Sequence, residues 1–217
     1  MMRIRFGAVA AGCLSIGLAA IAQDSKLEAP TVDEKAGTVT FSGKACKTDV
    51  YEQLKGMVEF AIVMPKGKAY ESLFEAPVDP IKLNDALKKI GAKSGKPATD
   101  EKNPATGDKI RISIQWKAGE QERTEPIEKF IHDVETKKPM ETPGWIFQGS
   151  KEGFVPELGD MGLLVLANKN LIGLYQGEGA CLLTNSAPLM SGHRYKVNKD
   201  LHPKEGTPVK FVMQLAK

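Results

Sequence analysis

Few side chains in this sequence have the type and spacing that chemistry requires, and the three histidines come first. His132 ends a short apolar segment, whereas His193 and His202 lie in an irregular stretch without a nearby carboxylate pattern. A zinc site needs several ligands at defined spacings, and a general base needs a partner within reach. The sequence also lacks the glycine-rich phosphate loop and the Gly-x-Ser-x-Gly nucleophile elbow. We therefore expect no catalytic residue, no metal site and no cofactor.

Four other residues are candidates for binding a ligand. Tyr70 and Glu71 follow the turn signal Pro65-Lys66-Gly67, and on a strand they would face opposite sides. Trp145 shares a strand face with Phe147, and Ser150 follows shortly afterwards, so this segment could line a pocket. The alternative for each is structural: Tyr70 and Trp145 in the core, Glu71 in water.

The two cysteines outside the N-terminal segment, Cys46 and Cys181, are candidates for a disulfide that would close a loop of about 135 residues. The alternative is two buried thiols, because no spacing rule constrains a single pair. Neither cysteine belongs to a Cys-x-x-Cys motif, which argues against thioredoxin chemistry, haem attachment and iron–sulfur clusters.

The N-terminal segment indicates export. Arg3 and Arg5 precede an uncharged run that ends at Gln23, and Ala20-Ile21-Ala22 is typical of a peptidase site. We expect residues 1–22 to be a cleaved signal peptide, which places the protein in the periplasm or outside the cell. Two alternatives keep it at a membrane: an uncleaved leader that acts as an anchor, or lipidation of Cys13.

Charge argues against some classes of partner. Without residues 1–22, 28 basic side chains balance 27 acidic ones, with both signs interspersed. Nucleic-acid binding would need a clustered basic face. We therefore expect no nucleic-acid partner and no membrane contact beyond the leader, which leaves an unknown envelope ligand or protein as the partner.

Hydrophobic periodicity predicts the elements that would position these residues. Asp79 and Pro80 begin a helix over 79–90 with a C-terminal stop at Gly91, and Pro126 begins a short helix over 126–132. Period-two alternation predicts strands. The strand segments are 38–41, 58–64 paired in a hairpin with 68–74, 110–116 paired with the segment around 123–124, 145–147, 162–166 and 209–215.

Many strands with one clear helix and one short helix predict an α+β fold with a largely antiparallel sheet. The stretch 94–108 contains prolines and glycines and is expected to be a surface loop. No long linker divides two cores, so we expect a polar leading segment over 23–37 and a single domain over 38–217.

Five phrases in this order resemble the YdjY-type domain of exported bacterial proteins over most of residues 38–215. They are Pro65–Leu73, Asp79–Leu87, Pro104–Gly107, Trp145–Ser150 and Gly206–Val209. The resemblance implies an exported protein of unassigned activity. Relatives tend to carry histidines where Tyr70 and Asn84 stand here. If those histidines form a site in relatives, only Glu71 and Ser72 carry over.

Three functions follow from these residues. The leading hypothesis is a non-catalytic binding or structural module, because no catalytic constellation is coherent. The first alternative is a hydrolytic or metal-dependent enzyme that uses Glu71 or Asp160 with a loop histidine, and it requires Glu71 close to His193 or His202 in a cleft. The second is a redox protein that works through Cys46 and Cys181, which requires adjacent, exposed sulfurs.

The leader makes a direct prediction about the mature N-terminus. Mass spectrometry of the protein purified from its native envelope fraction should find an N-terminus at Gln23, often cyclised, because the peptidase cuts after small residues. An N-terminus at lipidated Cys13, or an intact leader, would contradict cleavage after Ala22.

Overall fold

The structure is a computed structural model that describes residues 26–141, 144–177, 179–187, 189–190 and 194–216. The predicted signal peptide over 1–22 lies outside the described residues, and so does His193. No helix among the described residues has both the length and the apolar character needed to cross a membrane.

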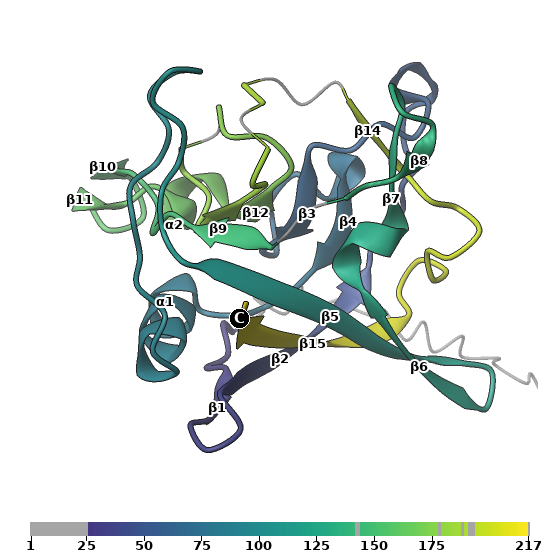
Figure 1. Cartoon of the computed structure of the whole chain (residues 1–217), viewed down its shortest axis with the longest axis horizontal. Coiled ribbons are helices and arrows are strands. Elements are labelled where there is room, and N and C mark those ends of the chain that lie inside the picture. Colours follow the sequence, from purple (N-terminus) through teal and green to yellow (C-terminus); the bar gives the residue numbers. More distant parts are fainter. Residues whose placement is uncertain (1–25, 142–143, 178, 188, 191–193, 217) are drawn as a thin grey trace, which may run out of the picture.

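The described residues form mainly short strands (Figure 1). The strands are β1 (Thr31–Asp33), β2 (Thr38–Ala45), β3 (Phe60–Val63), β4 (Ser72–Glu75), β5 (Lys109–Ala118), β6 (Gln121–Pro126), β7 (Ile131–Asp133), β8 (Lys138–Pro139), β9 (Trp145–Phe147), β10 (Glu152–Val155), β11 (Asp160–Leu163), β12 (Asn170–Gly173), β13 (Leu183–Thr184), β14 (Tyr195–Val197) and β15 (Pro208–Leu215). The helices are α1 (Pro80–Lys89) and α2 (Val165–Asn168), with 3-10 turns η1 (Glu52–Leu54), η2 (Ala69–Glu71) and η3 (Ile127–Phe130).

The main sheet closes on itself. Its strands follow the order β1-β2-β15-β5-β9-β13-β12-β3-β4, and β6 adds to the outer edge of β5. A further pairing of β2 with β4, at Lys44 with Glu75 and Ala45 with Phe74, joins the two ends of the path from β2 to β4. Eight strands therefore form a ring, which removes most exposed sheet edges.

The predicted α+β class is wrong, because the fold is mostly β and its sheet is closed. Alternation of apolar residues identifies a strand and its buried face, but it does not say which strands meet. Here the ring depends on pairings between segments far apart in the sequence, such as β2 with β15 and β12 with β3. The sheet is also mixed, because β3–β4 and β12–β13 are parallel pairs.

The helix predicted to begin at Asp79 and Pro80 is confirmed as α1. The Asp79 carboxylate accepts hydrogen bonds from the backbone N–H groups of Ile81 (2.9 Å) and Lys82 (3.1 Å), so it caps α1. Leu83 and Leu87 are fully buried against the main core. The hairpin of β5 with β6 and the strand β15 also form where alternation predicts them.

Three other local predictions are wrong. Segments 58–64 and 68–74 are not a hairpin, because η2 crosses between them and β4 runs parallel to β3. Segment 126–132 is a 3-10 turn followed by strand β7, and segment 162–166 is the end of β11 followed by α2. In each of these three cases tertiary pairing overrides the local pattern. The strand predicted over 38–41 is confirmed as the first part of β2, which extends further and lies inside the sheet between β1 and β15.

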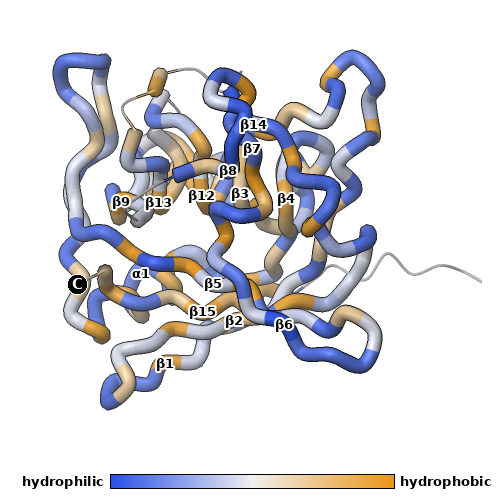
Figure 2. Tube along the Cα trace, turned by 45° about the vertical axis from the view of Figure 1, so that its right-hand side comes forward, coloured by the Kyte–Doolittle hydropathy of each residue, from blue (hydrophilic) through white to orange (hydrophobic). Residues whose placement is uncertain are grey.

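Buried apolar residues from all eight strands of the ring belong to one core cluster. Figure 2 shows hydrophobic residues recurring along these strands. Phe74 lies in an aromatic cluster, edge-on to Phe130 (5.4 Å between ring centroids) and to Phe211 (5.7 Å). His202 packs against the Phe74 ring (5.3 Å), and its Nε2 donates to the Leu73 carbonyl at 2.9 Å. The partly buried imidazole therefore packs against the edge of the core.

Burial of His202 predicts a loss of stability in mild acid. Desolvation lowers the pKa of His202 below its ordinary 6.5, and backbone hydrogen bonds offset this only in part. Between the two pKa values the unfolded chain binds a proton at His202 that the folded chain does not bind. The contribution of His202 to the free energy of unfolding is therefore fully present above about pH 6.5 and is lost as pH falls through the lower folded pKa. Urea unfolding at pH 7, 6 and 5 measures the decline.

The variant His202→Gln keeps a side-chain N–H donor, now an amide in place of the ring N–H, but its side chain does not titrate. It should cost about 1 kcal/mol at pH 7 through lost packing and show a flatter dependence of unfolding free energy on pH than the wild type. Parallel curves for the two proteins would contradict this role of His202.

Candidate functional site

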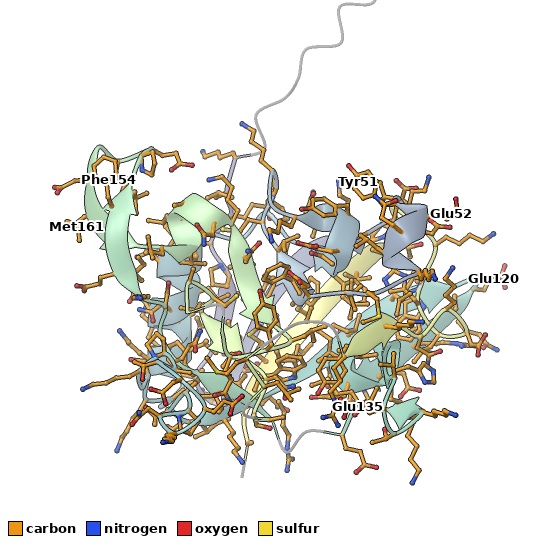
Figure 3. The ribbon with its side chains drawn as sticks, turned by 90° about the horizontal axis from the view of Figure 1, so that it is seen from above. Tyr51, Glu52, Glu120, Glu135, Phe154 and Met161 are labelled. Carbon is orange, nitrogen blue, oxygen red and sulfur yellow. The ribbon has the colours of Figure 1, made fainter. Side chains whose placement is uncertain are left out.

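Tyr70, one of the four predicted ligand-binding residues, lines a surface hollow. It lies in η2, between β3 and β4, and is 36% exposed. Its ring meets that of Tyr51 edge-to-face, with centroids 5.4 Å apart and planes at 77°. Figure 3 labels Tyr51 at the surface of this end of the molecule. Two adjacent, partly exposed aromatic rings are a common feature of binding surfaces.

The hollow beside Tyr70 has a volume of about 530 Å³, and we call it the Tyr70 hollow. Its walls come from the end of β2, the turn before η2, β4 and a late loop. They consist of Lys44, Ala45, Cys46, Lys47, Val50, Gly67, Ala69, Tyr70, Glu75, Glu205 and Gly206. Its lining combines apolar surface with two lysines and two glutamates, so a ligand with an apolar face and polar edges would fit.

The ring closure fixes one wall of this hollow. Lys44 on β2 and Glu75 on β4 are register partners, and Lys44 Nζ lies 3.0 Å from Glu75 Oε1. The Lys44 side chain is 55% exposed, so the pair contributes little to stability but sets the position of both charges. The Lys44 ammonium faces solvent, where a ligand could exchange hydrogen bonds with it, whereas the Glu75 side chain is only 18% exposed.

Glu71 does not join Tyr70 in the hollow. Its carboxylate is buried and pairs with Lys68, with 2.9 Å between Nζ and Oε1, while Lys68 also approaches Glu59 at 3.8 Å. Burial alone would lower the pKa of Lys68, but the hydrogen bond and charge of Glu71, together with Glu59, raise it overall. The Lys68 ammonium also lies over the Phe60 ring at 5.3 Å. Glu71 thus holds η2 in place.

Trp145 and Ser150 lie away from the Tyr70 hollow, and their roles in the structure are internal. The indole of Trp145 is fully buried and donates to Glu128 at 2.8 Å, and desolvation raises the pKa of that carboxyl. The Ser150 hydroxyl donates to the Ala180 carbonyl at 2.7 Å and accepts from the Val165 backbone N–H at 3.2 Å. Their part in ligand binding stays a prediction.

The predicted disulfide between Cys46 and Cys181 is absent from the structure, where both cysteines are buried thiols. They occupy different environments: Cys46 lies on the wall of the Tyr70 hollow, whereas Cys181 packs against Phe60 and Val63. Desolvation, reinforced by the nearby charge of Glu75, raises the pKa of Cys46 to about 12. The Cys46 thiol therefore stays protonated at neutral pH and is a poor nucleophile.

The residues of the enzymatic alternative are engaged by other partners in the structure. Glu71 is engaged by Lys68, and His202 by the Leu73 carbonyl. Asp160 is exposed on β11, where its Oδ1 accepts from the Met161 backbone N–H at 2.7 Å. Within the part of the chain that the structure describes, no three His, Cys, Asp or Glu side chains gather closely enough to hold a metal ion.

Sequence reasoning missed most of the hollow. Lys44, Glu75 and Glu205 come together only because the ring closes at β2 and β4, and no local pattern reports that contact. Val50 and Tyr51 did carry a signal, as two large apolar side chains within a polar stretch, and they are 43% and 46% exposed. Such a pair is typical of an interaction site when it lies beside a hollow.

The cysteine environments predict a specific labelling pattern. In the native protein iodoacetamide should modify Cys46 and Cys181 very slowly, because both are buried and the thiolate of Cys46 is scarce at neutral pH. After unfolding in guanidinium without reductant, peptide mapping should find both cysteines fully alkylated. A reduced sample is the control and should give the same labelling. Protection of either cysteine that only a reductant removes would contradict the structure.

Comparison with known proteins identifies a family but no characterised relative. The YdjY domain matches residues 31–214, which is most of the chain and includes every strand of the closed ring and the Tyr70 hollow. No curated protein and no solved structure matches this sequence. The chain therefore belongs to the YdjY-domain family.

Proposed function

We propose that this protein is an exported, non-catalytic binding module whose ligand site is the Tyr70 hollow. The observation that carries the proposal is the exposed Tyr51–Tyr70 pair beside a hollow of about 530 Å³ with mixed charges. Aromatic rings in a rigid setting bind an apolar face at little entropic cost, and the lysines and glutamates supply hydrogen bonds that fix orientation.

The electrostatics of the hollow support binding rather than turnover. Lys44 and Glu75 neutralise each other across the ring closure. Cys46, the one thiol on the wall, is held protonated by burial. A catalytic nucleophile needs a pKa near the working pH and a partner that activates it, whereas burial raises the pKa of Cys46 well above neutral pH.

Export is part of the proposal and rests on the leader sequence. The uncharged run that ends at Gln23 and the Ala20-Ile21-Ala22 site support a secreted or periplasmic location. Thiols that are buried suit such a location, because they are protected from oxidants outside the cytoplasm.

Native mass spectrometry of the protein purified from its own envelope fraction tests the site. The wild type should carry a bound small molecule. Tyr70→Ala should lower its occupancy in line with an affinity loss of tenfold or more, about 1.4 kcal/mol, because one aromatic wall is lost. The hollow is surface-exposed, so this variant should fold normally by circular dichroism.

Phe154→Ser provides the matched control. Phe154 is also an exposed aromatic, at 61%, but it lies on the β10–β11 hairpin at the opposite end of the view in Figure 3. The Phe154→Ser variant should therefore carry the bound molecule at the same occupancy as the wild type. Equal loss in both variants, or equal retention, would place the ligand elsewhere, and conversion of the molecule to a product on incubation would contradict a non-catalytic role.

A further inference from the structure

Two more hollows adjoin the Tyr70 hollow along β2. The first, of about 290 Å³, shares Lys44 and Glu75 with it and extends to Ser42 and Gly43. The second, of about 410 Å³, shares Ser42 and Gly43 with the first and continues over β15, β5 and β6. Neighbouring hollows have wall residues in common, so the three lie in succession along β2, and we call this row of hollows the β2 track.

We propose that the β2 track binds a neutral oligosaccharide chain, with the Tyr70 hollow at one end. This inference rests on the proposed function and adds a ligand class and a second half to the site. A single hollow accommodates a small molecule. A row of three hollows that crosses β2, β15, β5 and β6 fits an extended polymer.

The register of the sheet places polar side chains in a row along the far half of the track. Ser42 pairs with Lys210, Lys210 with Gln115, and Gln115 with Thr124, so these four residues lie side by side across β2, β15, β5 and β6. Adjacent strands lie about 4.8 Å apart, which is close to the length of one pyranose unit in a linear chain. The row therefore offers hydroxyl, ammonium, amide and hydroxyl groups at the repeat of a sugar chain.

The charges of the track favour an uncharged ligand. Its walls carry five basic and four acidic side chains, so there is almost no net field to attract a polyanion. The basic residues are Lys44, Lys47, Lys117, Arg123 and Lys210, and the acidic residues are Glu28, Glu75, Glu122 and Glu205. Interspersed donors and acceptors of this kind match the hydroxyl groups of a neutral sugar.

The pairing of β2 disfavours an extended peptide along the part of the track that follows this strand. Peptides that bind to sheets usually add a strand and need a run of free backbone groups at an edge. β2 pairs with β15 on one side and with β1 and β4 on the other, so it has no open edge of strand length, and the open edge of the track lies at its far end on β6, which pairs with β5 alone among the described strands. A sugar chain needs no such edge, because its hydrogen bonds go to side chains and its C–H faces stack on aromatic rings. The Tyr51–Tyr70 pair supplies such rings at one end.

Isothermal titration with defined neutral oligosaccharides tests the proposal. The probes are cello-, malto- and chito-oligosaccharides, each from disaccharide to hexasaccharide, with heparin fragments as charged competitors and an unrelated peptide library as the peptide arm. The full mature protein should bind at least one neutral series, with affinity rising about tenfold or more from the disaccharide to the hexasaccharide. Heparin fragments should not compete.

Variants at the two ends of the track separate this inference from the proposed function. Gln115→Ala with Thr124→Ala removes one half-buried and one exposed polar side chain of the far half. The double variant should abolish the gain of affinity with length, while disaccharide binding remains. Tyr70→Ala should weaken binding at every length, and Phe154→Ser should change nothing.

Any other result of these titrations contradicts either the β2 track, the ligand class or both. Binding that depends on Tyr70 but not on length removes the track and leaves the Tyr70 hollow as the site. Preference for heparin fragments or peptides overturns the ligand class. If no neutral series binds while the native ligand still depends on Tyr70, the oligosaccharide is wrong and the proposed function stands.

Discussion

The short pairing between β2 and β4 is the constraint on which the rest of the structure depends. Two register pairs, Lys44 with Glu75 and Ala45 with Phe74, convert an open sheet into a ring. The Cys46 backbone N–H extends the contact by donating to the Leu73 carbonyl at 2.9 Å, and the His202 ring donates to the same carbonyl. Phe74 is thereby fixed in the centre of the aromatic cluster, so closure and core formation are one event.

The same pairing builds the candidate site. The wall of the Tyr70 hollow that carries Lys44, Cys46 and Glu75 exists only where β2 meets β4, and η2 lies above it because the chain must cross between two parallel strands. Gly43 lies at this junction. A Cβ there would come within 2.5 Å of the Glu75 carbonyl and 2.7 Å of the Phe211 ring, so the strands approach too closely for a side chain.

Sequence reasoning succeeds for features that neighbouring residues decide. Asp79 and Pro80 dictate the start of α1 through a cap and a fixed backbone angle, and the alternation over β5 dictates its buried face. It fails for features that depend on distant partners. The residues of β3 and β4 alternate well enough for a hairpin, but whether they run parallel is decided by β2 and β12, which hold their outer edges. The turn signal before Tyr70 is local, so the sequence indicates this residue as part of a site. Lys44 and Glu75 come together only through the β2–β4 pairing, so the sequence does not indicate them.

The position of β15 in the sheet constrains the order of assembly. This strand is the last in the chain, yet it lies between β2, which comes early, and β5, and it forms the longest register in the structure with each of them. The ring cannot close until residues 208–215 are available, so a partly synthesised chain keeps its apolar strand faces unpaired. Folding is then a late event dominated by non-local contacts and correspondingly slow. Late closure of this kind is compatible with the proposed export, because a chain whose ring is still open has not yet folded.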